Sequence, residues 1–343
     1  MSYSESRSPT SVTPAFKQSR LWLHARNSWL GERVRALRRC LHELVALIRF
    51  NHPEVPQVQE LCKSILTLQD IHSTAEEAGE DLEAPIFLLS TGWRAGSTLL
   101  QRVLVTDPDL LLWGEPLAEM SLVSRLTEMV SLSISDRNLA LWKRQPALKS
   151  VPLAETWIAN LYPSAEDFRS ALRAVFDRWL CKPARDEGFA RWGFKEVRMG
   201  AAEAVFLNWI YPNAKFLVIS RHPYDCYRSL ADSGWGHVYD RYPNVIVDSA
   251  AAFAWHWNRI AVSWFELSSE FPLKRIKFED MIAGRVDFRE LESWLGIKIN
   301  ETAALSASVG KTATRATLNW YERLIISHEA APGMCALGYS KRP

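Results

Sequence analysis

The first part of the chain carries apolar residues at a helical spacing. Between Leu21 and Phe50, large apolar side chains recur every three or four residues, which predicts an amphipathic helix. Its polar positions are rich in arginine: Arg33, Arg35, Arg38 and Arg39. Such a helix can bind a membrane surface or an acidic partner, and the plainer interpretation is that it packs on a neighbouring domain. A second helix is predicted from about Val55 to Ala78.

From residue 84 onward, short apolar runs alternate with helical stretches. The apolar runs are Pro85–Ser90, Leu110–Trp113, Trp192–Val197, Lys215–Ser220 and Arg275–Phe278. The helical stretches are Ser97–Thr106, Ser164–Leu180, Ala201–Tyr211, Tyr224–Asp232 and Ser249–Glu270. This alternation predicts an α/β domain with a mainly parallel sheet flanked by helices. We therefore expect a disordered tail at 1–18, a helical extension at 19–83 and the α/β domain at 84–343.

Composition narrows the classes of protein and partner. Hydrophobic residues make up 48% of the chain and charged residues 23%, the balance of a folded globular protein. With 41 basic and 39 acidic side chains, the net charge of +2 gives no footprint for a nucleic-acid duplex, so no nucleic-acid partner is expected.

The cysteines and the polar N-terminus bear on localisation. The five cysteines are scattered without a C-x-x-C pair, which favours reduced thiols over a zinc site or a disulfide framework. The first 20 residues are polar and rich in serine, unlike a secretory signal, and no apolar run reaches the length of a transmembrane segment. A cytoplasmic protein is therefore expected.

A glycine-containing loop joins the first predicted strand to the helix after it. Gly92 and Gly96 allow the backbone to curl so that its N–H groups point at an anion, and the N-terminus of the helix adds a positive dipole end. Arg94 supplies a fixed positive charge, while Ser97 and Thr98 supply hydroxyl donors. The loop is therefore a predicted phosphate or sulfate site. It lacks the lysine of a Walker A motif, because Ser97 directly follows Gly96.

A second anion-binding segment follows the strand at 215–220. Arg221 comes directly after that strand, and the helix that begins at Pro223 carries Ser229. Ligands of parallel sheets bind beyond the carboxyl ends of the strands, which places Arg221 at the same edge as the glycine loop. A guanidinium grips a phosphate with two parallel hydrogen bonds. Two phosphate sites on one edge match a nucleotide that carries phosphates at both ends.

These segments resemble the nucleotide-binding motifs of sulfotransferases that use 3′-phosphoadenosine-5′-phosphosulfate (PAPS). The loop resembles the family's P-[RK]-S-G-T-[TS]-L-L segment, with Trp93 in place of the proline, and FLVISRHPYDCYRSL resembles its 3′-phosphate segment. The resemblance implies a P-loop-like fold. It also implies that Arg221 and Ser229 hold the 3′-phosphate. The residues implied to hold the 5′-phosphosulfate are Arg94, Ala95, Gly96, Ser97, Thr98 and Leu99.

The same resemblance suggests which residues carry the chemistry. Glu115, 21 residues beyond Arg94, matches the catalytic glutamate of tyrosylprotein sulfotransferases and is the expected general base, helped if partly dry surroundings raise its pKa. Lys195, in a W-G-x-K-[DE]-x-R segment, is expected to offset charge on the leaving group, together with Arg94. The plainer alternatives are a strand-end carboxylate paired with an arginine and a surface lysine. His237 is the reserve base.

Weaker matches and rival functions complete the prediction. Lys311 and Arg315 occupy the place of a late loop that covers the cofactor in relatives. PAPS as donor, PAP as product, no metal, a small-molecule or carbohydrate acceptor and a homodimer are all compatible with the resemblance. One rival is an ATP-dependent small-molecule kinase, against which the absent lysine argues. Another is a non-catalytic PAP-binding protein, against which Glu115 and Lys195 argue together.

Overall fold

The computed structural model describes residues 29–50, 57–72, 83–115, 120–133, 152–155, 163–233, 238–240, 245–300 and 317–340. The chain divides into two compact units, residues 1–50 and 51–343. The described part of the first unit is essentially one helix, α2 (Trp29–Arg49). The tail predicted at 1–18 lies outside the described residues, and the predicted boundaries at 18 and 83 stay a prediction.

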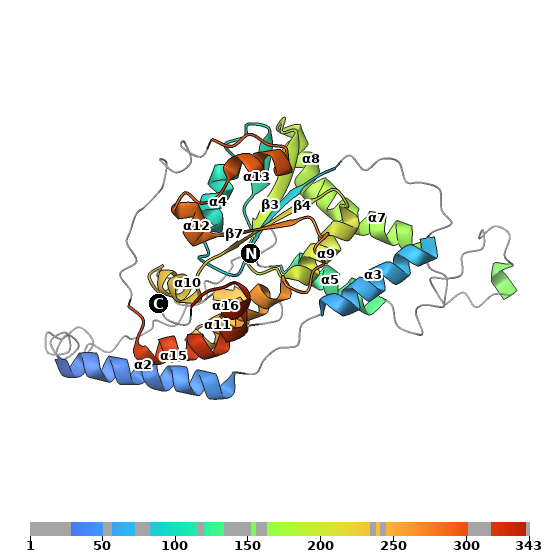
Figure 1. Ribbon diagram of the computed structural model, residues 1–343. Coiled ribbons are helices and arrows are strands. Elements are labelled where there is room, and N and C mark those ends of the chain that lie inside the picture. Colours follow the sequence, from blue (N-terminus) through green and yellow to red (C-terminus); the bar gives the residue numbers. More distant parts are fainter. Residues whose placement is uncertain are drawn as a thin grey trace, which may run out of the picture. The chain divides into compact units, whose positions relative to one another are not determined.

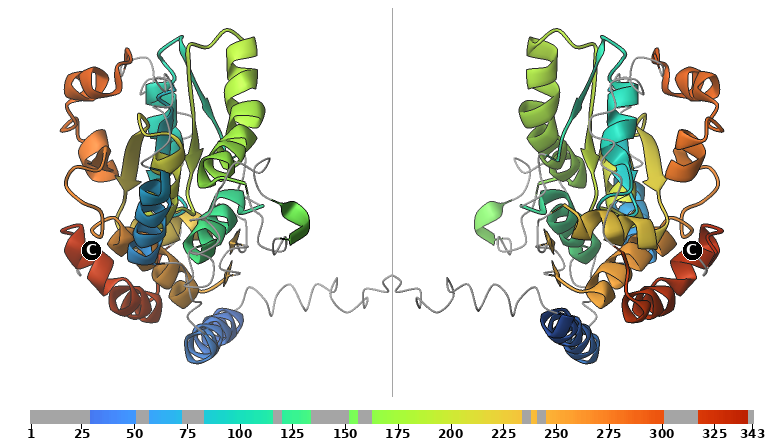
Figure 2. Two further views of the ribbon diagram at one scale, coloured as in Figure 1. Left: turned by 90° about the vertical axis from the view of Figure 1, so that its right-hand side faces the viewer. Right: turned by 90° about the vertical axis from the view of Figure 1, so that its left-hand side faces the viewer.

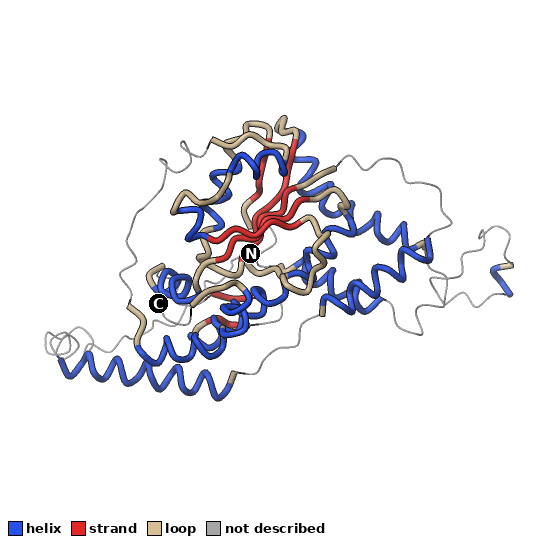
Figure 3. Tube along the Cα trace, in the orientation of Figure 1, coloured by secondary structure: helices blue, strands red, loops and turns tan. Residues whose placement is uncertain are grey.

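A five-stranded sheet forms the centre of the second unit (Figure 3). Its strands lie in the order β2-β3-β1-β4-β7, and every neighbouring pair is parallel. This confirms the predicted mainly parallel α/β domain. The strands are β1 (Ile86–Ser90), β2 (Leu110–Trp113), β3 (Arg191–Glu196), β4 (Lys215–Ser220) and β7 (Leu273–Lys277).

Helices cover both faces of the sheet (Figures 1 and 2). Because side chains alternate along a strand, β1 buries Phe87 and Leu89 in one core cluster and Ile86 and Leu88 in the other. The first cluster includes side chains of α3 (Val58–His72), α5 (Leu122–Ser133), α7 (Ala165–Phe176) and α9 (Ala201–Ile210). The second includes those of α4 (Ser97–Leu104), α12 (Phe278–Ile282) and α13 (Phe288–Leu295).

Further helices gather beside the sheet. Helix α11 (Ala250–Ser263) packs against α15 (Trp320–Glu329) and α16 (Ala331–Ala336). Helix α10 (Pro223–Ala231) contacts α11 and α15. The remaining described elements are an antiparallel pair, β5 (Val238–Asp240) and β6 (Val245–Val247), a 3₁₀ turn (Leu153–Glu155), a π-helical turn (Asp177–Cys181) and α8 (Lys182–Asp186).

Several boundaries differ from the sequence prediction. The helix expected over 164–180 ends at Phe176 and continues as the π-helical turn, just before Pro183, which has no N–H to donate within an α-helix. The helix expected to reach Glu270 ends at Ser263. The last strand ends at Lys277, and Phe278 begins α12, whose first turn carries two acidic residues that favour a helix N-terminus.

Candidate active site

The loop between β1 and α4 has the backbone geometry of an anion cradle. Gly92 and Gly96 have φ angles of 125° and 94°, and Gly96 is the N-cap of α4. A Cβ at Gly96 would overlap the ring of Phe278, so only glycine fits there. The loop is tied to β4 because the Thr91 amide donates to the Ile219 carbonyl at 3.1 Å. The glycine requirement inferred from the sequence therefore has a steric cause at Gly96.

Arg94 joins the two predicted phosphate-binding segments. It is exposed and has a φ of 64°, a left-handed conformation that is uncommon outside glycine. Its Nε donates to the Ser229 hydroxyl at 3.0 Å, and the Arg221 guanidinium donates to the Arg94 carbonyl at 3.2 Å. Arg221 also lies over the Phe278 ring, 4.5 Å from its centroid. The structure thus brings Arg94, Arg221 and Ser229 together at the carboxyl edge of the sheet.

The other loop residues have distinct environments at the start of α4. Ala95 and Ser97 are buried, Gly96 and Leu99 are half-buried, and Thr98 is exposed. A side chain at the first turn of a helix lies beside free backbone N–H groups. Thr98 is therefore accessible to a ligand, whereas Ala95 can contribute only its backbone N–H.

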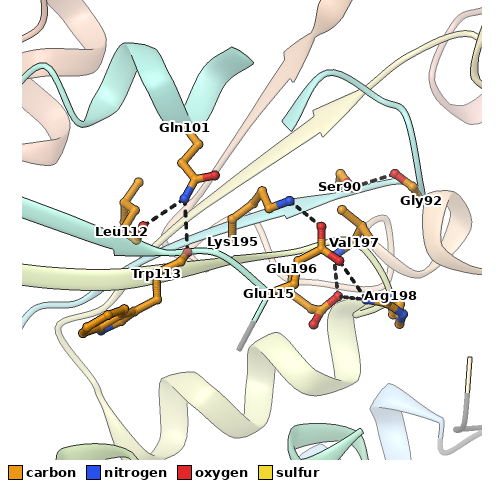
Figure 4. A network of polar contacts seen from close by, with 10 residues as sticks. All are labelled: Ser90, Gly92, Gln101, Leu112, Trp113, Glu115, Lys195, Glu196, Val197 and Arg198. Atoms are coloured by element: carbon orange, nitrogen blue, oxygen red, sulfur yellow. Dashed lines mark hydrogen bonds and ion pairs between the residues drawn. The ribbon is translucent and has the colours of Figure 1, made fainter. Parts of the chain in front are cut away.

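Glu115, Lys195 and Arg198 form an ion-pair cluster (Figure 4). The cluster lies by β2 and β3, on the side of the loop opposite Arg221. Lys195 lies on β3, donates to Glu115 and is only 7% exposed. Arg198 donates to Glu115 at 3.0 Å and to Glu196 at 2.8 Å. The backbone fixes the pairing, since the Lys195 amide donates to the Gly114 carbonyl at 3.1 Å. Lys195 is therefore not a surface lysine, and the predicted base and charge-stabilising residue are direct partners.

The electrostatics of Glu115 differ from the expectation. Burial alone raises the pKa of Glu115, but the Lys195 ammonium and the Arg198 guanidinium outweigh it, so the pKa lies below its ordinary value. The condition stated for the general base, a pKa raised by dry surroundings, is therefore not met at Glu115. The raised pKa belongs to Glu196 instead, which is almost completely buried and which Arg198 only partly compensates.

Trp93 and His256 pack against each other beside the loop, and neither is among the site residues that the sequence predicts. Trp93, which replaces the family's proline, is 3% exposed and lies against the fully buried His256 with ring centroids 4.3 Å apart. The Arg198 guanidinium lies 5.4 Å from the Trp93 ring centroid. Burial, aided by the charges of Arg259 and Arg198, lowers the pKa of His256 well below its ordinary value, so its ring is neutral. The signal for this contact in the sequence is the replacement of the family's proline by Trp93.

The C-terminal segment contacts the side chains of Ser220 and His222, on either side of Arg221. The His222 amide donates to Glu279 at 2.9 Å, and the Tyr339 hydroxyl donates to the other oxygen of Glu279 at 3.1 Å. Tyr339 also lies 3.1 Å from the Ser220 hydroxyl. Neither Glu279 nor Tyr339 is among the site residues that the sequence predicts. We call Ser220, His222, Glu279 and Tyr339 the C-terminal tether.

Three predicted residues cannot be placed. His237, Lys311 and Arg315 lie outside the described residues. Within the described part of the chain, no group of three or more His, Cys, Asp or Glu side chains could hold a metal ion.

Comparison with known proteins gives a family match and remote structural similarity. A family model, the sulfotransferase family, matches residues 85–301, which is more than half of the chain. No curated protein matches this chain. A sulfotransferase from Alicyclobacillus acidocaldarius is 18% identical with a TM-score of 0.40, over 75% of this chain and 95% of that one. The sulfotransferase domain from the curacin biosynthetic pathway is 16% identical with a TM-score of 0.41, over 76% and 99%. A Mycobacterium tuberculosis H37Rv sulfotransferase is 14% identical with a TM-score of 0.35, over 79% and 84%.

Proposed function

The chain belongs to the sulfotransferase family, and on that premise we propose that it transfers a sulfuryl group from PAPS to a hydroxyl group of a small-molecule or carbohydrate acceptor. The observation that carries the proposal is the contact between Arg94 and Ser229 at 3.0 Å, reinforced by the Arg221 bond to the loop. Two anion-binding segments meet at one sheet edge, as a nucleotide with phosphates at both of its ends requires.

The residues at this edge fit the charge of such a nucleotide. The loop turns tightly at Gly96, where a Cβ would overlap the Phe278 ring, and it ends at the N-terminus of α4, which favours an anion. Arg94 and Arg221 provide the positive charge at its two sides. In this proposal Arg94 and the backbone at 95–99 bind the 5′-phosphosulfate, and Arg221 and Ser229 bind the 3′-phosphate.

Bound PAPS would supply the activated sulfuryl group, with PAP as the leaving group. Glu115 takes the proton of the acceptor hydroxyl while the new bond from that oxygen to sulfur forms and the bond from sulfur to the phosphate oxygen breaks. Lys195 balances the negative charge on the departing oxygen. The products are a sulfate ester and PAP, so atoms and charge balance without a metal.

Because Glu115 and Lys195 form an ion pair, the proposed roles of these two residues depend on nucleotide binding. With both cations beside it, Glu115 is a weak base, because its pKa is lowered. When Lys195 turns toward the sulfuryl oxygens, one of those cations is withdrawn and the basicity of Glu115 rises. Occupation of the nucleotide site therefore prepares the base.

Calorimetric titration with PAP tests the nucleotide site. We expect micromolar binding to the wild type and a loss of about tenfold or more in Arg221→Ala, because a charged, bidentate phosphate contact is removed. Arg228→Ala is the matched control. It also removes one positive charge, from α10, but Arg228 pairs with Asp225 and is not expected to contact the nucleotide. Magnesium-ATP binding without PAP binding would identify a kinase and refute the proposal.

Turnover by Glu115→Gln tests the chemistry separately. The amide cannot accept the acceptor's proton, so we expect the rate with PAPS to fall about 10²–10⁴-fold while PAP affinity changes little. Because the acceptor is unidentified, the assay screens phenols, alcohols and sugars with labelled PAPS. Tight PAP binding with no turnover by the wild type in any of these would favour a non-catalytic PAP-binding protein.

A further inference from the structure

Within the first unit, helix α2 carries a continuous apolar face. Its large aliphatic side chains are between 43% and 83% exposed: Val34, Leu37, Leu41, Leu44, Val45 and Ile48. At 3.6 residues per turn these side chains fall within an arc of roughly 100° along most of the helix. A face of this size on a folded protein marks an interaction surface.

The charges of α2 are arranged around that face in a definite order. Arg33 borders it on one side, and Arg38 and Arg49 border it on the other. The acidic residues, Glu32 and Glu43, lie on the opposite side of the helix. Arginine side chains at such borders can cover apolar surface with their stems while their guanidinium groups reach an anionic layer.

We propose that α2 binds an anionic lipid surface, lying in the plane of the interface. The apolar face would enter the boundary of the acyl chains, and the bordering arginines would contact lipid phosphates. None of the described helices is long and apolar enough to cross a bilayer, so α2 lies on the surface and does not span it. The proposal concerns α2 alone and does not depend on the proposed function.

A second copy of this helix is a less suitable occupant. Val34, Leu37, Leu41, Leu44 and Ile48 also have the spacing of a coiled-coil seam. In a parallel pair, however, Arg33 of one chain would face Arg38 of the other, and an antiparallel pair would bring the two Arg38 side chains together. Within α2 itself, neither border carries an acidic residue. Lipid phosphates neutralise these arginines, whereas a second α2 repels them.

Vesicle sedimentation of the purified full-length chain tests the proposal. Vesicles of phosphatidylcholine with phosphatidylserine should bind the chain, and pure phosphatidylcholine vesicles should bind it markedly less. Added salt should weaken the binding, because it screens the contribution of the arginines. No sedimentation with anionic vesicles, or equal sedimentation with neutral ones, would overturn the proposal.

Neighbouring positions on α2 provide matched variants. Leu37→Glu places a charge on the apolar face and should abolish vesicle binding, whereas Ala36→Glu places it away from that face and should leave most of it. Arg38→Glu should weaken binding about tenfold or more, clearly more than Arg39→Glu, although both change the net charge equally. Circular dichroism checks that each variant keeps its helix.

Light scattering on the same variants tests the competing occupant. If the wild type is a dimer without lipid, and Leu37→Glu makes it a monomer while vesicle binding is absent, a second copy occupies the face and the proposal is wrong. Equal effects of Arg38→Glu and Arg39→Glu would likewise contradict a surface defined by the borders of this face.

Discussion

Backbone conformation at single glycine positions decides which side chains the chain accepts there. Gly96 and Gly188 both have strongly positive φ angles, 94° and 91°. They differ in their surroundings, because a Cβ at Gly96 would overlap the Phe278 ring while one at Gly188 would meet open space. The pair therefore separates the cost of the left-handed conformation from the cost of steric overlap.

Gly96→Ala should destabilise the protein more than Gly188→Ala. Both substitutions carry the conformational cost of about 1–2 kcal/mol, and overlap with Phe278 should add about 1–3 kcal/mol at Gly96 alone. Urea unfolding measures the difference. Gly96→Ala should also weaken PAP binding, because Phe278 supports Arg221. Equal destabilisation by the two variants would contradict the crowding at Gly96.

His256 should give the protein a pH-dependent stability near neutrality. Its pKa is lowered in the folded state, so below the ordinary pKa of about 6.5 the unfolded chain binds a proton that the folded chain does not. The stabilisation is complete above that pH and is lost as the pH falls, by about 1.4 kcal/mol per pH unit.

Urea unfolding of the wild type and of His256→Gln between pH 5 and 7.5 isolates this contribution. The difference between their unfolding free energies should shrink by about 1 kcal/mol per pH unit below pH 6.5. His328→Gln is the control, since His328 is an exposed residue of α15. A difference that stays constant with pH would show that His256 is not buried as a neutral ring.

At the scale of elements, the segments after β4 and β7 and the C-terminal segment are coupled through the C-terminal tether. Glu279, in the first turn of α12, accepts hydrogen bonds from the His222 amide and from Tyr339. Trp257 of α11 also donates to the Arg221 carbonyl, at 3.2 Å. The backbone at Arg221 and His222 is thus bonded by α11 and α12, and Tyr339 acts on it through Glu279, which leaves the Arg221 guanidinium in place before a ligand arrives.

Tyr339→Phe should loosen that arrangement without touching the nucleotide. Removing one hydroxyl that serves two partners should raise the dissociation constant of PAP and the KM for PAPS about three- to tenfold, with kcat at saturating PAPS unchanged. Tyr211→Phe is the control, because its hydroxyl donates to Asp177, in the π-helical turn. A fall in kcat with unchanged KM would be inconsistent with a positioning role.

At the scale of the whole molecule, positive side chains would supply, in the proposed reaction, the charge that many phosphate-transfer enzymes obtain from magnesium. Arg94 and Arg221 contact each other at the loop, and Lys195 and Arg198 pair with the carboxylates of Glu115 and Glu196. We expect EDTA to leave PAPS-dependent turnover unchanged and added magnesium to have little effect. A loss of turnover in EDTA that magnesium restores would contradict a metal-free site and favour the kinase.

The sequence by itself determined the class of fold, and it located the two segments that we propose to bind anions. A continuous apolar run is a local pattern, and the ends of the parallel strands were predicted to within about two residues. The glycine loop and the Arg221 segment were recognisable because their chemistry resides in short contiguous stretches. By contrast, α5, α13, α15 and α16 were not predicted, since their amphipathic patterns are short and depend on tertiary packing.

Only the tertiary structure decided how the residues of the site meet. The order β2-β3-β1-β4-β7 puts the Glu115 cluster on one side of the loop and Arg221 on the other. It also decided that Lys195 and Arg198 lower the pKa of Glu115, and that Tyr339 contacts Ser220 and Glu279 beside Arg221. Strand order and ion pairing join residues far apart in the chain, so no local pattern of apolar and polar positions encodes them.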